Sequence, residues 1–134
     1  MIFAGVADTH TALWYVFGDE RLSKRAKRFI DDAAASPQKI AVSVISLAEI
    51  VYLVEKNRIA PSAYEDIARA LSDPDHVFIE EQLSTGIVGA MRLVPREAVP
   101  DMPDRIVAAT AIYLRVPVIS RDGRIRASSV ETIW

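Results

Sequence analysis

Residues 2–17 read IFAGVADTHTALWYVF, and this stretch decides the fold class. Its first six residues form a short apolar run that is typical of a buried strand. Residues 9–17 follow with the composition of a helix, which Gly18 is suited to end. Asp8 stands between the two, where an aspartate can cap the helix. A buried strand that passes directly into a helix is the repeating unit of an α/β fold.

The same alternation continues along the rest of the chain. Further strands are expected at residues 40–44, 76–79, 116–120 and 132–134, and further helices at residues 23–35, 46–56, 61–71, 84–93 and 104–114. Strands that alternate with helices predict a mostly parallel central sheet flanked by helices. With 134 residues, the chain is expected to form a single domain over residues 1–134.

Composition narrows the class of protein. The chain is 51% apolar, and its 16 basic and 18 acidic residues leave a net charge of −2, which excludes an overall polycation but allows a local nucleic-acid patch. There is no cysteine, so disulfides, thiol chemistry and zinc–thiolate sites are excluded. No basic leader and no apolar stretch of ~20 residues is present, so we expect a cytoplasmic protein without a membrane segment.

Acidic residues recur where helices are expected to begin. Asp8 precedes the first helix, and Glu49 completes a Ser46-Leu47-Ala48-Glu49 capping box. In PDMPDRIVAATA (residues 100–111), Asp101 can cap a helix whose first turn contains Asp104. Asp122 is followed by Gly123, which is a turn signal. Each acid, taken alone, therefore has an ordinary structural explanation.

These explanations do not account for the shared location of the acids. Each lies just past a strand or in the first turn of a helix, and such points gather at the carboxyl edge of a parallel sheet, where ligands bind. Asp104 does not directly follow a clear strand, so its place at that edge is less determined. Two carboxylates ~4 Å apart repel by about 4 kcal/mol at an effective dielectric constant near 20, so a cluster needs a shared proton or a cation.

Oxygen ligands without cysteine or a histidine cluster favour Mg²⁺ or Mn²⁺ over zinc. Such ions usually serve phosphoryl chemistry. The hydroxyls of Thr9, Thr11 and Ser120 could position a carboxylate or a metal-bound water, although a capping or strand-end role explains each hydroxyl equally well.

The chain resembles PIN-domain nucleases, in particular the VapC-like toxins of bacterial toxin–antitoxin pairs. The similar segments are VADTHTALW (6–14), VSVISLAEI (42–50), DMPDRIVAATA (101–111), VISRDGRIR (118–126) and VETIW (130–134). They occur in the order of the family and extend over the whole chain. The resemblance implies a PIN-like three-layer sandwich.

The resemblance also implies a site and an activity. It places the acidic quartet of the family on Asp8, Glu49, Asp104 and Asp122, which would be both the catalytic residues and the metal ligands. Asp101 matches a frequent additional acid, and Thr9 and Ser120 match polar positions beside the metal. The implied activity is Mg²⁺- or Mn²⁺-dependent cleavage of RNA by a homodimer that a VapB-like antitoxin inhibits.

Two basic clusters could contact RNA. Arg121, Arg124 and Arg126 follow the last motif, and a phosphate-binding role there is as well supported as a solvated surface. The second cluster, between Arg21 and Arg28, is interpreted as a solvated helix face. His10 is interpreted as structural, and Trp14 as a core or dimer contact.

Other classes fit less well. A haloacid-dehalogenase-type phosphatase would need an aspartate at the position of His10, and nucleotide-binding glycine fingerprints are absent. A housekeeping PIN-type RNA-processing nuclease remains the nearest alternative. A non-catalytic protein-interaction module also remains open, but it would leave the acidic cluster unexplained.

Overall fold

The computed structural model describes residues 1–134 and contains five strands and seven α-helices. The strands are β1 (Ile2–Ala7), β2 (Gln38–Ser43), β3 (Phe78–Glu81), β4 (Val118–Ile119) and β5 (Thr132–Ile133). The helices are α1 (Thr9–Phe17), α2 (Lys24–Ala34), α3 (Val44–Glu55), α4 (Ala63–Ser72), α5 (Thr85–Ala90), α6 (Met102–Leu114) and α7 (Gly123–Ala127), and the 3₁₀ turn η1 (Met91–Leu93) follows α5.

The strands form one sheet in the order β3-β2-β1-β4-β5, and all four pairings are parallel. The predicted α/β class is confirmed, and the sheet is more regular than the mostly parallel one expected. From the central strand β1, the chain first builds outward through β2 and β3, and later returns to add β4 and β5 on the other side. The order therefore reverses between β1 and β4, and a reversal of this kind creates a crevice at the carboxyl ends of the two strands.

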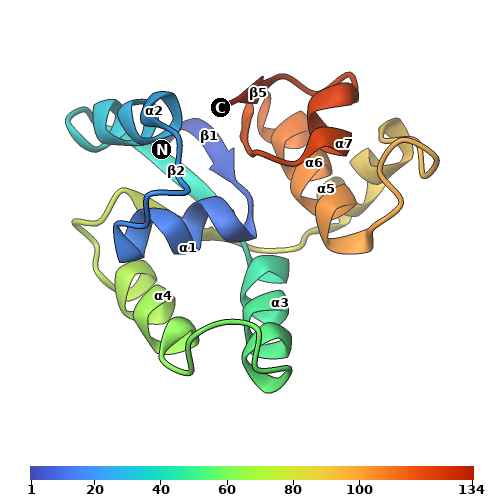
Figure 1. Ribbon diagram of the computed structural model, residues 1–134. Helices are drawn as coiled ribbons and strands as arrows, with labels where there is room; N and C mark the ends of the chain where they lie inside the picture. Colours follow the sequence, from blue (N-terminus) through green and yellow to red (C-terminus); the bar gives the residue numbers. More distant parts are fainter.

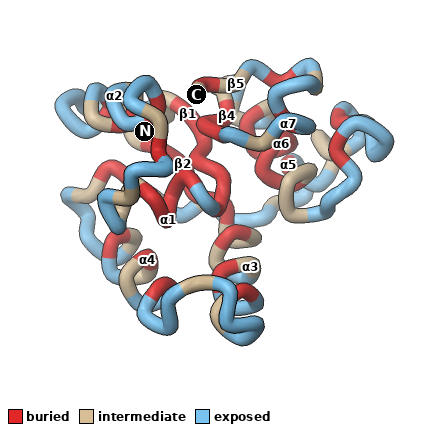
Figure 2. The backbone as a smooth tube through the Cα atoms, in the orientation of Figure 1, coloured by how far each residue is buried: buried red, intermediate tan, exposed pale blue.

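Helices cover both faces of the sheet, as Figure 1 shows. On one face, α1, α2 and α4 pack against alternate strand residues such as Ala7, Val42 and Ile119. On the other, α5, α6 and α7 cover Val6, Ala41 and Val118. In Figure 2 the buried backbone is concentrated in the strands and in the sides of the helices that face them. The period of two along each strand thus divides the core into two apolar layers.

Helix starts account for the main differences from the sequence-based expectations. Helix α3 begins at Val44 and not at residue 46, because Ser43 accepts a hydrogen bond from the backbone N–H of Ile45 and acts as its cap. The expected turn at Asp122-Gly123 is wrong as well, since Asp122 caps the short helix α7. The expected helix over residues 84–93 is divided into α5 and η1. None of the helices combines the length and the apolar character that crossing a membrane requires.

Candidate active site

A pocket of about 310 Å³ is lined by four of the predicted site acids, Asp8, Glu49, Asp104 and Asp122. Asp8 follows β1, and Asp122 follows β4. These are the two strands between which the strand order reverses. Glu49 lies on α3, which directly follows β2, and Asp104 lies in the first turn of α6. Four separate segments therefore deliver one carboxylate each to the same hollow.

Asp8 is fixed by two hydrogen bonds from different parts of the chain. Its Oδ1 accepts from the backbone N–H of Thr11 at 2.9 Å, which is the capping bond expected from the sequence. Its Oδ2 accepts from the hydroxyl of Ser120, at the end of β4. Thr11 ties the same two segments together, because its hydroxyl donates to the Ile119 carbonyl at 2.8 Å. Asp8 is thus both a helix cap and a pocket carboxylate.

Glu49 is oriented by Thr9. The Thr9 hydroxyl oxygen lies 2.5 Å from Glu49 Oε1 and 3.0 Å from the hydroxyl of Ser46, and all three groups belong to one network. A hydroxyl has a single proton, so Thr9 donates to the carboxylate and accepts from Ser46. The capping-box interpretation of Ser46 and Glu49 is therefore wrong. Ser46 is fully buried within the first turn of α3, and Glu49 faces the pocket.

Asp122 reaches the pocket from the start of α7. Its Oδ1 accepts from the backbone N–H groups of Arg124 at 2.8 Å and Ile125 at 3.1 Å. Its own N–H donates to the Ser120 hydroxyl oxygen at 3.0 Å, and that hydroxyl in turn donates to Asp8. Ser120, which is fully buried, therefore sets the relative positions of two of the four carboxylates.

Asp104 differs from the other three acids because its carboxylate accepts no hydrogen bond from the protein. Burial and, after it, the negative charges of Asp101, Asp122, Glu49 and Asp8 together raise the pKa of Asp104 to about 7. The neighbouring Arg105 does not compensate, since its guanidinium turns away to the carbonyls of Met91 and Val94. Asp104 is therefore a partly buried carboxylate that is surrounded by negative charge and that no protein donor binds.

This donor set fits a hard divalent cation. All candidate ligands are carboxylate oxygens, the type that Mg²⁺ and Mn²⁺ prefer. Both oxygens of Asp104, Oε2 of Glu49 and Oδ2 of Asp122 accept no bond from the protein and are free for an ion. No three acidic or histidine side chains are already arranged to hold a metal ion, so binding would require the carboxylates to close in.

The remaining predicted residues divide into two groups. Thr9 and Arg121 line the pocket, and Ser120 lies directly behind it. Asp101 does not line it; this exposed residue caps α6 by accepting from the Asp104 N–H at 3.1 Å. Arg124 and Arg126, on α7, are exposed and also lie outside the pocket lining.

Three residues in the pocket wall were not predicted as site residues, namely His10, Trp14 and Arg21. The guanidinium carbons of Arg121 and Arg21 lie 4.7 Å and 5.1 Å from the centroid of the Trp14 ring. The signal available in the sequence was the basic residue at position 21, ahead of α2, but nothing there linked it to a tryptophan of α1.

The four acids of the pocket all lie between residues 6 and 129 of the chain. Residues 6–129 match the PIN domain family, which covers all four pocket acids. The chain is a member of the PIN domain family. Comparison with curated protein sequences finds no match.

Solved structures of similar fold cover nearly the whole chain. One similar chain comes from a crystal structure of VapBC2 from Rickettsia felis bound to a DNA fragment from their promoter. It has a TM-score of 0.70 and 16% identity, with 98% of this chain and 97% of that chain covered. Another comes from a toxin–antitoxin complex of Klebsiella pneumoniae, with a TM-score of 0.66, 22% identity, and 97% and 96% coverage.

The raised pKa of Asp104 predicts a pH dependence of stability in this PIN domain. A carboxyl whose pKa is about 7 in the folded state and 3.8 otherwise holds its proton more tightly when folded. Its contribution is therefore most favourable below pH ~4 and is lost as the pH rises through 7. We expect Asp104→Asn to flatten the fall in melting temperature between pH 5 and pH 8, measured in chelator. Equal slopes for the variant and the wild type would contradict the description of this pocket.

Proposed function

We propose that this PIN domain is a Mg²⁺- or Mn²⁺-dependent endoribonuclease and the toxin of a toxin–antitoxin pair. The observation that carries the proposal is the convergence of four carboxylates on one pocket, where burial and the neighbouring acids raise the pKa of Asp104. A site of repelling acids is unfavourable unless a cation or a proton compensates it. A metal-dependent phosphodiesterase provides a reason for the chain to maintain such a site.

The four acids have different parts in this proposal. Asp8, Glu49, Asp104 and Asp122 would hold the ion. When bound, a divalent cation supplies an activated water and neutralises charge on the phosphate. Thr9 orients Glu49, and Ser120 orients Asp8, so these hydroxyls restrict the carboxylates to the directions in which a cation can meet them.

The structural comparison supports a toxin over other nucleases. The two structures described above come from toxin–antitoxin systems, and they match this chain over nearly its whole length. A VapB-like antitoxin as partner, a homodimer as the assembly and the cytoplasm as the location follow from that analogy and belong to the proposal. A housekeeping PIN-type RNA-processing nuclease would share the pocket but would have no antitoxin. A non-catalytic interaction module would have no need of the acids.

A cleavage assay with purified protein tests the activity. Single-stranded RNA of ~30 nucleotides, labelled at one end, is incubated with Mg²⁺, with Mn²⁺ or with chelator. We expect internal cleavage with either ion and none in chelator. Cleavage that persists in chelator would refute the metal-dependent mechanism, and intact RNA with every ion would refute the nuclease.

Purification from the native host separates a toxin from a housekeeping nuclease. A toxin is expected to co-purify with a small antitoxin protein and to lose its RNA cleavage in that complex. Expression alone should arrest growth, and co-expression of the partner should restore it. A protein that purifies without a partner and does not affect growth would support the housekeeping alternative.

Thr9→Val provides a test of how the pocket is positioned. The substitution keeps the shape of the side chain but removes the hydroxyl that binds Glu49. Loss of such an orienting bond typically weakens metal binding or activity by about 10–100-fold. Thr11→Val is the matched control, because the Thr11 hydroxyl binds a backbone carbonyl and not an acid. A similar activity loss in both variants would show that the Thr9–Glu49 contact has no specific role.

A further inference from the structure

The pocket needs positive charge near its mouth if an RNA strand is to enter it. Four carboxylates attract a metal ion, but they repel the negative charge of a phosphodiester. Only two cationic residues, Arg21 and Arg121, line the pocket, and both lie over the ring of Trp14. Trp14 is 5% exposed, so its ring is a fixed support that holds two flexible side chains at the pocket wall.

The two arginines are not equivalent. Arg21 is bound to Asp19, with Nε 3.1 Å from Oδ1 and a terminal nitrogen 2.7 Å from Oδ2. Arg121 has no acidic partner within ion-pair distance, so its full charge is available to a phosphate. Arg121 therefore provides an unpaired positive charge at the pocket wall, and Arg21 lies at the same wall with its charge partly compensated by Asp19.

A basic face of α2 continues from Arg21. Lys24, Arg25 and Arg28 line a second hollow of about 500 Å³, and its lining contains no acid. Their spacing places them on one side of the helix, away from the buried Ala26 and Ile30. None of the three has an ion-pair partner, whereas Lys27 points to another side and is paired with Asp31 at 2.7 Å.

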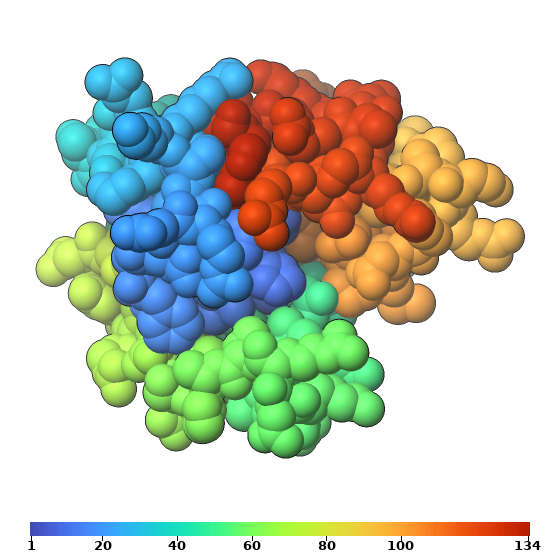
Figure 3. Space-filling model, viewed as in Figure 1, coloured from blue at the N-terminus to red at the C-terminus, as the bar shows by residue number.

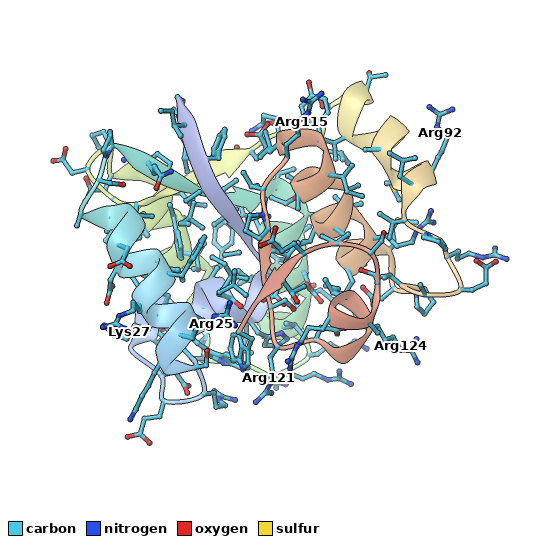
Figure 4. All side chains as sticks on the ribbon, turned by 90° about the horizontal axis from the view of Figure 1, so that it is seen from above. Arg25, Lys27, Arg92, Arg115, Arg121 and Arg124 are labelled. Atoms are coloured by element: carbon cyan, nitrogen blue, oxygen red, sulfur yellow. The ribbon has the colours of Figure 1, made fainter.

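The figures place this face beside the pocket segments. In Figure 3 the light-blue surface of α2 adjoins the red surface of the C-terminal segments, and α2 packs against β5. In Figure 4 Arg25 extends from α2 on the same side of the molecule as Arg121, while Arg92 and Arg115 lie at the opposite end.

We propose that Arg21, Lys24, Arg25 and Arg28, here called the α2 track, bind the phosphodiester backbone of an RNA strand whose scissile phosphate lies in the acidic pocket. This inference rests on the proposed function, and it adds the path that the substrate follows. Trp14, the ring on which Arg21 lies, is buried, so we expect the track to contact phosphates and not to stack on bases. It provides affinity without sequence preference. The strand is placed along α2 because Lys24, Arg25 and Arg28 line one hollow together and follow Arg21, which is at the pocket wall. Arg124 and Arg126 on α7 offer the alternative path, which the control variant below tests.

Binding measured without cleavage tests this path. Fluorescence anisotropy with a labelled single-stranded RNA of ~20 nucleotides, in chelator, compares the wild type with two triple variants. The test variant carries Lys24→Ala, Arg25→Ala and Arg28→Ala. The control carries Lys27→Ala, Arg124→Ala and Arg126→Ala, and it removes the same charge from surfaces outside the proposed path. Thermal melts check that both variants are folded.

The salt dependence gives the expected size of the effect. Each phosphate contact to a single strand contributes about 0.7 to the slope of log affinity against log salt. Loss of three contacts should reduce the slope by about 2 and lower the affinity at least tenfold at low salt. Arg121→Ala alone should reduce the slope by about 0.7. The control should retain a slope close to that of the wild type.

Several outcomes would overturn the inference. If the test variant binds like the wild type, or if the control loses as much affinity, the strand does not follow α2. If the wild type does not bind the RNA, there is no track. A protein that binds through α2 but cleaves nothing with Mg²⁺ or Mn²⁺ would refute the proposed nuclease and leave the track. One that cleaves RNA equally well in both variants, with unchanged KM, would refute the track and leave the nuclease.

Discussion

Asp8→Asn is expected to abolish RNA cleavage and to leave the fold intact. Asparagine caps a helix about as well as aspartate, so the bond from the Thr11 N–H is retained. The amide N–H can also donate to Ser120, whose hydroxyl oxygen then accepts this bond where it donates to Asp8 in the wild type. What is lost is the negative charge and, in the proposed metal site, one oxygen ligand of the ion. Removing a group that only orients a ligand costs about 10–100-fold, so loss of a ligand should reduce activity by at least about 100-fold.

The measurement is a pair of assays on the same preparation. Initial rates of RNA cleavage in Mn²⁺ report activity, and thermal unfolding in chelator reports stability. We expect a melting temperature within a few degrees of the wild type. A variant that keeps more than a tenth of the activity would remove Asp8 from the metal site, and an unfolded variant would show that its role in the cap predominates.

Asp104→Asn should raise the metal-free stability of the protein and abolish its RNA cleavage. The carboxylate accepts no hydrogen bond and is destabilised by burial and by four neighbouring acids. Its removal at pH 8 should raise the metal-free stability, by the ~0.5–2 kcal/mol that is common for improved charge placement. The same change should abolish cleavage and reduce the stabilisation that Mn²⁺ provides, because a ligand is lost.

Asp101→Asn is the matched control for this substitution. Asp101 lies three residues earlier and caps α6, but it does not line the pocket. Asparagine preserves the cap, so a small change in stability and at most a partial loss of activity are expected. A response to Mn²⁺ in Asp104→Asn that equals the wild type would mean that Asp104 is only a helix-start acid.

The sequence predicted the parallel α/β sheet because its signals are local. The apolar run of Ile2–Ala7 predicts the strand, and Asp8 predicts the cap of the helix that follows. The structure contains both the strand and the capped helix. The gathering of acids at one edge also followed from the geometry of parallel strands. Asp104 was the least determined by this argument, and the structure brings it to the pocket through the start of α6.

Other features depended on choices that the sequence left open. Ser43 and Ser46 are both able to cap a helix, and the end of β2 at Ser43 decides between them. Because Ser43 caps α3, Ser46 lies buried within the helix and hydrogen-bonds Thr9. The same Thr9 hydroxyl, from a different segment, donates to Glu49. The stacking of Arg21 and Arg121 on Trp14 joins residues that lie far apart in the chain, and no local pattern predicts it.

The central claim is that Asp8, Glu49, Asp104 and Asp122 share one divalent cation. Anomalous diffraction from crystals grown with Mn²⁺ tests it most directly, because the ion is located without reference to activity. We predict one or two Mn²⁺ peaks in the pocket, with oxygens of Asp104 and of at least two of the other acids within about 2.2 Å. A pocket without a Mn²⁺ peak at millimolar Mn²⁺, with the four carboxylates placed as they are here, would contradict the account.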